Sequence, residues 1–393
     1  MTDAPPVVER TGAPSAKPAP GPIIFFDFAR GVSAQAVVLG HALNIFVPGI
    51  FMVPGQRVFY MQSFAVIIFF VLSGFLITSA VLKKKSQPGF TFGSYLIDRI
   101  ARVVYPLVPA LFLITVFDFL VLHGSTKLPF IRIDLSPQTI AGNFLLLFNH
   151  PILQELAPRL RMPWISVGPV GSGAPLWSVV AEWWIYVAFG LLAFAAIRRM
   201  KLGVGSALLL VFAIAVPVGY MAKGGYESLA WIIGMLYAMA AAQLRKLPAS
   251  FHGMLAILAT AGFLVSLYYG GQNLHAASAI GTASVAFCHL YFWLSGRKER
   301  AAAAPNFDGA RPAPATQWFN KASVFLSSFS YSLYLIHFSV ITYLWFYLHD
   351  RLSAWQLIPL ALVVSNVLAY GYFLLVERHF HKVGKFLKAR LLR

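Results

Sequence analysis

Ten separate apolar stretches, each long enough to cross a lipid bilayer, constrain the fold of this chain more than any other feature. A bilayer offers no water to hydrogen-bond the backbone, so spans of this kind are helical. Of the 393 residues, 59% are hydrophobic and only 11% are charged, whereas soluble domains are about a quarter charged. The sequence therefore predicts an all-α polytopic membrane protein with about ten transmembrane helices. The expected spans are residues 23–47, 61–82, 103–123, 175–197, 204–222, 228–244, 252–270, 276–295, 326–348 and 355–376.

The basic residues lie between the apolar stretches, which predicts the orientation of the chain. No nucleic-acid-binding signature accompanies the net charge of +18, and the cationic groups instead flank spans, as cytoplasmic loops require. With ten spans and an internal N-terminus, every basic cluster is cytoplasmic, and so are both termini. These clusters are Lys83–Lys85 with Arg99 and Arg102, Arg198–Lys201, Arg245–Lys246, Arg297–Arg300, and the tail from Arg378 onward.

The segments outside the spans differ in composition. Residues 1–21, rich in Pro and Ala, predict a disordered cytoplasmic tail, and residues 384–393 a basic C-terminal tail. The long outer loop 124–174 contains an apolar stretch, 139–149, that is too short to cross and is expected to be re-entrant or interfacial. Residues 296–325 are Ala/Pro-rich and predict a flexible cytoplasmic linker.

Arg30 and His41 lie within the first apolar stretch, where ionisable groups are costly and are functional by default. They are eleven residues apart, so they share one helical face and are separated by about 16 Å along the axis. Asp27 lies on the same flank and can pair with Arg30. A snorkelling arginine and a packed histidine are the structural alternative.

Arg99 and Arg102 form a second candidate, at the predicted cytoplasmic mouth of the third span and just before Tyr105. Their i,i+3 spacing puts both guanidinium groups on one face, where they can bind phosphate. Ordinary flanking charge of a cytoplasmic loop explains such a pair equally well.

Further polar residues occur inside predicted spans. Glu182, between tryptophans, needs a partner or a water-filled cavity. His337 is either functional or a satisfied core histidine, and Glu377 either acts in the site or balances neighbouring cations. Ser73 precedes Gly74, a pair more typical of close helix packing. The only cysteine, Cys288, excludes an intrachain disulfide and a cysteine metal cluster, and no metal site is predicted.

In their order along the chain, these motifs resemble those of the acyltransferase family 3 membrane proteins. The resemblance covers about residues 22–383, which would form one transmembrane acyltransferase domain. The matching blocks are Phe26–Gly31 with His41 at the family's Arg-x10-His spacing, Phe70–Phe75, Arg99-x-x-Arg102, Trp177–Tyr186 with Glu182, and Ser330–His337. Two positions depart from the family pattern: Trp183 stands where a second acid often follows, and His379 stands where proline is common.

The resemblance implies transfer of an acyl group, usually acetyl, from acyl-CoA to a hydroxyl of a carbohydrate, in the inner membrane of a bacterium. The donor acyl-CoA, a surface or exported glycan and membrane lipids are then the partners, with no further cofactor. His41 would be the general base, with Arg30 and Glu182 completing the catalytic set. Arg99, Arg102, Tyr105 and Ser73 would bind the donor.

Two other classes remain open from the residues alone. A glycan or small-molecule transporter would also use intramembrane Arg, His and Glu, although no internal repeat of broken spans is evident. A non-catalytic scaffold would leave the buried charges unexplained.

Overall fold

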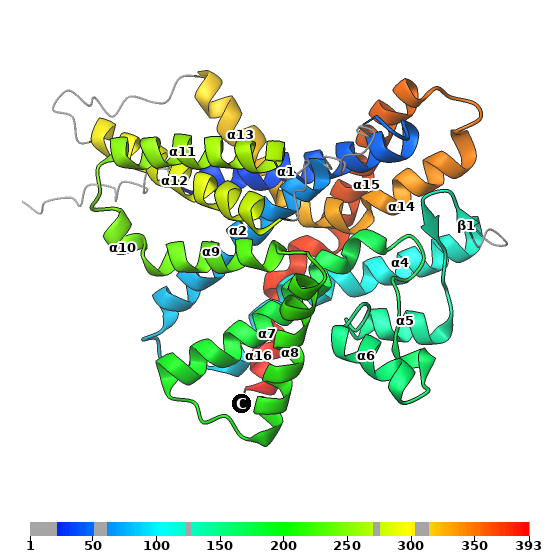
Figure 1. The fold of residues 1–393 in the computed structure, drawn as a ribbon, viewed down its shortest axis with the longest axis horizontal. Helices are drawn as coiled ribbons and strands as arrows, with labels where there is room; N and C mark the ends of the chain where they lie inside the picture. Colours follow the sequence, from blue (N-terminus) through cyan, green and yellow to red (C-terminus); the bar gives the residue numbers. More distant parts are fainter. Residues whose placement is uncertain (1–21, 51–60, 123–126, 270–275, 303–313, 393) are drawn as a thin grey trace, which may run out of the picture.

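The computed structural model describes residues 22–50, 61–122, 127–269, 276–302 and 314–392, and the predicted tail 1–21 lies outside them. Most of these residues are helical, and the described strands form one short antiparallel hairpin (Figure 1). The prediction of an all-α polytopic membrane protein is confirmed. In chain order the elements are α1 (Pro22–Phe46), α2 (Met61–Lys84), α3 (Phe92–Arg99), η1 (Ile100–Val104), α4 (Tyr105–Val121), β1 (Lys127–Leu128), β2 (Ile131–Arg132), α5 (Pro137–Phe144), α6 (Pro151–Arg159), η2 (Pro163–Ile165), η3 (Ala174–Leu176), α7 (Trp177–Arg198), α8 (Val204–Ala222), α9 (Glu227–Met239), α10 (Ala241–Leu244), α11 (Ala249–Tyr269), α12 (Ala277–Ala302), α13 (Pro314–Ser328), α14 (Ser330–Leu348), α15 (Ala354–Leu375), η4 (Glu377–His379) and α16 (Phe380–Leu391).

Each of the ten predicted spans corresponds to an apolar helix, but they are not equally suited to cross a membrane. Among the described residues, eight helical segments are long and apolar enough to do so. α1 has the length, with 25 residues, but is made more polar by its charged and titratable side chains. α9 has only 13 residues, which is about 20 Å of helix and shorter than a bilayer core. Eight of the ten predicted spans thus meet both criteria within the described residues, and α1 and α9 are the two that do not.

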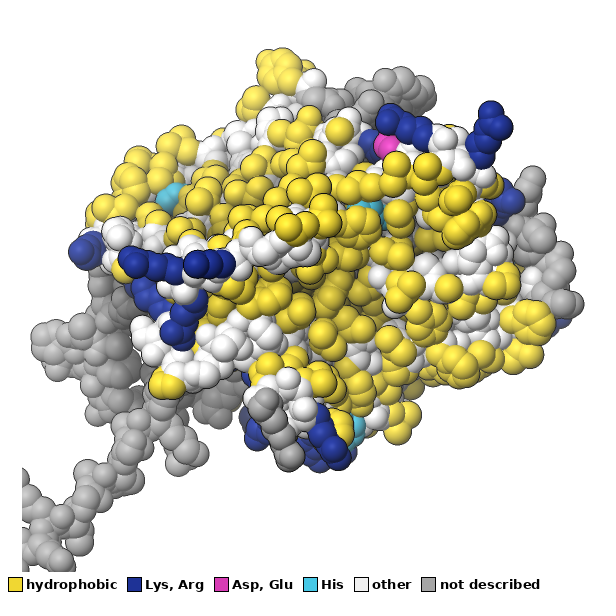
Figure 2. Space-filling model, turned by 90° about the horizontal axis from the view of Figure 1, so that it is seen from below, with side chains coloured by type: hydrophobic (Ala, Val, Ile, Leu, Met, Phe, Trp, Pro, Cys, Tyr) yellow, Lys and Arg dark blue, Asp and Glu magenta, His cyan; other side chains and the backbone are white. Residues whose placement is uncertain are grey.

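Several helices present apolar side chains outward, as expected in lipid. α8 and α11 bury little of their surface, and Val204 on α8 and Ile257 on α11 are 79% and 72% exposed. Figure 2 shows one wide hydrophobic face, with Lys and Arg gathered toward its margins. An apolar belt with charges at its borders is the surface expected of an integral membrane protein.

The helices α2 and α9 cross at a very short distance because both have glycine at the contact. A Cβ atom on Gly74 would overlap the backbone oxygen of Trp231, and one on Gly234 would overlap that of Val71. Small residues permit such backbone contact between membrane helices. The packing role predicted for Gly74 is confirmed. The close contact with α9 fixes the position of α2, which lines the site described below.

The segments between the spans are more ordered than the sequence suggested. The apolar stretch 139–149 forms no spanning helix, as predicted, and α5 has only eight residues. α12 and α13 extend into both ends of the predicted linker 296–325, while residues 303–313 lie outside the described residues. The expected tail 384–393 is instead mostly part of helix α16, which packs on η1 and α3. This helix forms because its small and apolar residues face the bundle, where Gly384 lies against Ala101.

Basic segments that are distant in sequence meet on one side of the bundle. Asp98 at the end of α3 pairs with Lys84 of α2 at 3.8 Å and with Lys388 of α16 at 2.6 Å. Arg198 at the end of α7 donates to the backbone oxygen of Gln87 at 2.7 Å. These contacts bring together the clusters that contain Lys84, Arg198 and Lys388, while a common face for all the clusters, and its cytoplasmic location, stay predictions.

Candidate active site

A cavity of about 190 Å³ lies between α1, α2, η1, α7 and α14. It brings together five predicted site residues, namely Arg30, Ser73, Arg99, Arg102 and Glu182. Neither His41 nor Tyr105 lines it. The remaining lining residues are Val66, Phe69, Phe70, Leu72, Leu76, Ile77, Val103, Ser178, Val179, Tyr186, Ser330, Tyr331 and Tyr334.

The two arginines of the third span are placed by a π-helical turn. The turn η1 continues α3 into α4 without a break, and it begins directly after Arg99 and contains Arg102. π-Helical turns are rare and occur frequently at functional sites, because the extra residue redirects neighbouring side chains. Both arginines line the cavity, although the π-helical turn replaces the regular helix from which their shared face was predicted.

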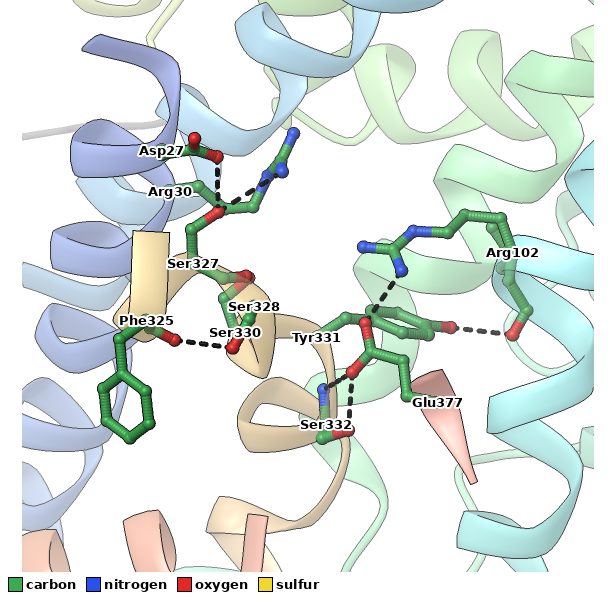
Figure 3. A network of polar contacts seen from close by, with 11 residues as sticks. Asp27, Arg30, Arg102, Phe325, Ser327, Ser328, Ser330, Tyr331, Ser332 and Glu377 are labelled. Carbon is green, nitrogen blue, oxygen red and sulfur yellow. Dashed lines mark hydrogen bonds and ion pairs between the residues drawn. The ribbon is translucent and has the colours of Figure 1, made fainter. Parts of the chain in front are cut away.

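Arg102 is held by the completely buried carboxylate of Glu377. Its Nη1 atom lies 2.9 Å from Oε1 of Glu377, whose Oε2 accepts hydrogen bonds from the backbone N–H and hydroxyl of Ser332 at 3.0 and 2.5 Å (Figure 3). The Arg102 guanidinium also lies 4.6 Å from the ring centroid of Phe380. Arg102 therefore already has a partner within the protein. Neither sequence interpretation of this residue, as a flanking charge of a loop or as a phosphate ligand, included that partner. Glu377 is accordingly the counter-ion of the pair.

Arg99 is held differently. Its guanidinium lies 5.8 Å from the ring centroid of Tyr95 and 5.9 Å from that of Tyr186, and its Nε atom is buried without a hydrogen-bond partner among the described residues. Aromatic faces stabilise a cation without using its N–H donors. The donors of Arg99 are thus the ones best able to bind an anionic ligand.

Arg30 approaches the cavity from α1. Its Nη1 atom donates to the Ser327 hydroxyl at 3.5 Å, and that hydroxyl donates to Oδ1 of Asp27 at 2.8 Å (Figure 3). The predicted pairing of Asp27 with Arg30 is therefore indirect and depends on a serine 297 positions away from the arginine.

Glu182 lies in a cluster of hydroxyl groups on the cavity wall. It interacts with the side chains of Ser73 and Tyr186, which are 2.7 Å from each other. Trp231 of α9 donates to Ser73 at 3.1 Å. The acid thus has the partners and the cavity that its position in a span required.

His41 lies beside a second histidine, outside the cavity lining. The ring centroids of His41 and His337 are 5.3 Å apart. His337 is completely buried, and its Nδ1 lies 2.9 Å from the backbone oxygen of Tyr334. A carbonyl only accepts, so Nδ1 carries the hydrogen, and Nε2 has no hydrogen-bond partner in the described part of the chain. Tyr334 lines the cavity and its ring centroid lies 5.7 Å from that of His337, so it connects the cavity wall to the histidine pair.

Tyr105, predicted to bind the donor, is the first residue of α4 and does not reach the cavity lining. Within the described residues, no group of three or more His, Cys, Asp or Glu side chains is arranged to hold a metal ion.

Asp118 is a buried polar residue that the sequence interpretation passed over. It lies inside the apolar helix α4 and is completely buried. The same signal that singled out Glu182, an acid within a predicted span, would have identified it.

The family model for an acyltransferase domain, Acyl_transf_3, matches residues 23–374, which include every residue of the cavity lining. The chain belongs to this family. The protein is therefore a membrane acyltransferase, and the family assignment favours this class over the transporter and scaffold alternatives. Comparison with curated proteins and with solved structures gives no match.

Proposed function

We propose that this membrane acyltransferase moves an acyl group, most simply acetyl, from acyl-CoA to a hydroxyl of a surface or exported carbohydrate. The observation that carries the proposal is the cavity into which Arg30, Arg99 and Arg102 all project from two different spans. Three guanidinium groups around one small space suit a donor with several phosphates. The inner membrane of a bacterium, with both termini cytoplasmic, is the proposed location, since CoA is then available at the basic side.

The donor would be held mainly by Arg99 and Arg30. The charge of Arg102 is largely balanced by Glu377. Arg102 would therefore contribute less to donor binding than Arg99 and would mainly fix the shape of the cavity wall. The cavity is too small for a complete CoA, so its Arg99 end would contact the phosphates, its opposite end would hold the acylated arm, and the rest of the donor would lie outside. Its apolar wall from α2 would keep water from the thioester.

His41 would act as general base on the acceptor. The acceptor oxygen attacks the thioester carbonyl while its proton passes to His41, and the carbon–sulfur bond then breaks to release CoA, whose sulfur takes up the proton. Arg30 would stabilise the negative charge that develops on the carbonyl oxygen, and Glu182 would orient the hydroxyl groups of Ser73 and Tyr186 on the cavity wall. For this geometry the acceptor must enter beside Tyr334, between the histidine pair and the cavity.

The test is acetyl transfer from labelled acetyl-CoA to a carbohydrate acceptor by the purified protein, compared with His41→Ala. Loss of a general base should lower the transfer rate by about 10²–10⁴-fold while donor binding is retained. His349→Ala is the matched control, because this histidine stacks on Trp345 at the far end of α14. A folded His41→Ala variant with the parent rate would exclude His41 as the base. Absence of any acetyl-CoA turnover by the parent, across several carbohydrate acceptors, would contradict the proposed donor.

A further inference from the structure

The chain between α6 and α7 enters the bundle without forming a regular helix or strand of more than one turn. Residues 167–175, here called the outer plug, are mostly buried, including Val170, Gly171 and Ser172. Buried backbone groups must be hydrogen-bonded. In this segment, side chains of other elements satisfy several of them. The Asn143 side chain accepts from the Val170 N–H at 3.2 Å and donates to the Gly168 oxygen at 2.9 Å.

The centre of the outer plug rests on Asp118 of α4. One carboxylate oxygen accepts from the Ser172 N–H at 2.5 Å, and the other accepts from the Ser172 hydroxyl at 3.0 Å and from the Tyr343 hydroxyl at 2.7 Å. Ser339 of α14 completes the set, 2.5 Å from the Ser172 hydroxyl. Gly171 has φ +49°, and a Cβ atom there would overlap the Asp118 carboxylate. The backbone of the plug is therefore in direct contact with this acid, and only glycine permits that contact.

The C-terminal end of the outer plug packs behind one end of the cavity, where it contacts Tyr334, although no residue of 167–175 lines the cavity itself. Tyr334 donates to the backbone oxygen of Pro175 at 2.9 Å, so the Ser178 hydroxyl, 2.5 Å from the same phenol, donates to Tyr334. Tyr334 and Ser178 both line the cavity. Ser178 precedes Tyr186 by eight residues of α7, about 12 Å, and Tyr186 lies beside Arg99. The plug therefore lies at the end of the cavity away from Arg99.

We infer that the outer plug, held by Asp118, separates the thioester end of the cavity from water, and that Asp118 is a positioning residue for acyl transfer. This inference rests on the proposed acyl-CoA donor. In the intact protein only the acceptor hydroxyl reaches the thioester carbonyl. If the plug is displaced, water attacks the same carbonyl, the carbon–sulfur bond breaks, and a free carboxylic acid and CoA are released without transfer.

The first test measures coupling, the ratio of CoA released to acyl groups transferred, in Asp118→Asn and Gly171→Ala. In Asp118→Asn, the amide N–H₂ group faces at least one of the N–H and O–H donors that now bind the carboxylate. In Gly171→Ala, the added Cβ atom displaces the plug, while Asp118 itself is unchanged. We expect the ratio to rise at least fivefold, with the KM for acyl-CoA changed less than twofold. Asp134→Asn is the matched control, because the Asp134 side chain binds only Ser136 and Thr139 among the described residues. Its contact with the plug is made by the backbone oxygen, which accepts from the Gly171 N–H at 3.0 Å and is kept in the variant.

A folded variant that loses transfer rate with an unchanged ratio would overturn the inference, since a purely structural role lowers both products together. Ser172→Ala provides a milder variant if the other two fail to fold, because it keeps the backbone hydrogen bond to Asp118. Its expected ratio lies between those of the parent and Gly171→Ala.

A second measurement does not depend on the identity of the donor. In a Cys288→Ser background, Ser178→Cys places a thiol at the plug end of the cavity, and a charged maleimide added to the purified protein reports its exposure to water. Adding Gly171→Ala should increase the labelling rate at least tenfold, while adding Asp134→Asn should not. Equal labelling rates with and without Gly171→Ala would overturn the plug itself. A tenfold increase in the labelling rate, together with no acyl-CoA turnover by the parent protein, would instead support the plug and contradict the proposed function.

Discussion

Glu377 and Asp118 are both completely buried acids, but they are stabilised in different ways. Glu377 forms an ion pair with Arg102 and also binds Ser332, whereas the described partners of Asp118 are hydrogen-bond donors from Ser172 and Tyr343. The first arrangement fixes a cation on the cavity wall near the proposed donor site. The second fixes the backbone of an irregular segment. The comparison indicates that Glu377 positions a charged side chain, whereas Asp118 positions a segment of backbone.

The ion pair should show the largest effect on stability. Glu377→Gln keeps the side-chain shape but leaves Arg102, whose side chain is 29% exposed, without its counter-ion. The loss of unfolding free energy should reach at most about 3 kcal/mol, the value for breaking a buried pair. The measurement is unfolding of the detergent-solubilised protein by SDS titration. In a cycle with Arg102→Gln, the double variant should lose much less than the sum of the single losses. Additive losses within about 0.5 kcal/mol would show that the pair is not coupled and would remove the contrast with Asp118.

Arg99 and Arg102 should respond differently to the same substitution. Arg99→Gln is expected to raise the KM for acyl-CoA about 30-fold, which is about 2 kcal/mol, because a charge-assisted contact to phosphate is lost. Its unfolding free energy should change little, since the Nε atom has no protein partner among the described residues. Arg102→Gln should lose both affinity and stability. Equal KM values for Arg99→Gln and the parent would leave Arg99 as a topology signal only.

The smallest effect is expected at the hydrogen-bonded acid. Tyr343→Phe removes one of the donors to Asp118 and leaves the two from Ser172 in place. A hydrogen bond to a charged group contributes about 1.5 kcal/mol to stability, and the same titration measures the loss. Tyr347→Phe, at an exposed position one turn further along α14, should be neutral. A loss of about 3 kcal/mol or more at Tyr343 would place Asp118 in the same class as Glu377.

The sequence predicts the features that depend on local pattern. Apolar length identified the helices, and the spacing of Arg99 and Arg102 indicated that the two lie together, as they do in the cavity lining. Gly74 indicated a close contact between helices, because small residues within a span permit one whatever the partner helix is. The structure shows that the partner is α9. Family membership also followed from short motifs in order, and the family model confirms it.

The sequence did not predict features that depend on tertiary pairing. Glu377 reaches Arg102 across 275 positions, and no local rule joins them. The indirect contact of Arg30 with Asp27 needs Ser327, from the opposite end of the chain. The helix α16 was mistaken for a tail because its charge dominates its composition, while a small face that packs on η1 determines its structure. The distance of His41 from the cavity likewise depends on how α1 and α14 pack.

The π-helical turn η1 couples the length of the chain to the direction of its side chains. It holds one residue more than an α-helical turn, so loss of a single codon between residues 100 and 104 would restore regular helix. Such a deletion would leave α4 in place and rotate α3 by about 100° about its axis, carrying Arg99 away from the cavity. Hydropathy and the number of helices would be unchanged. Relatives that differ here by one residue in length would therefore present Arg99 differently to the cavity without any substitution at the arginines.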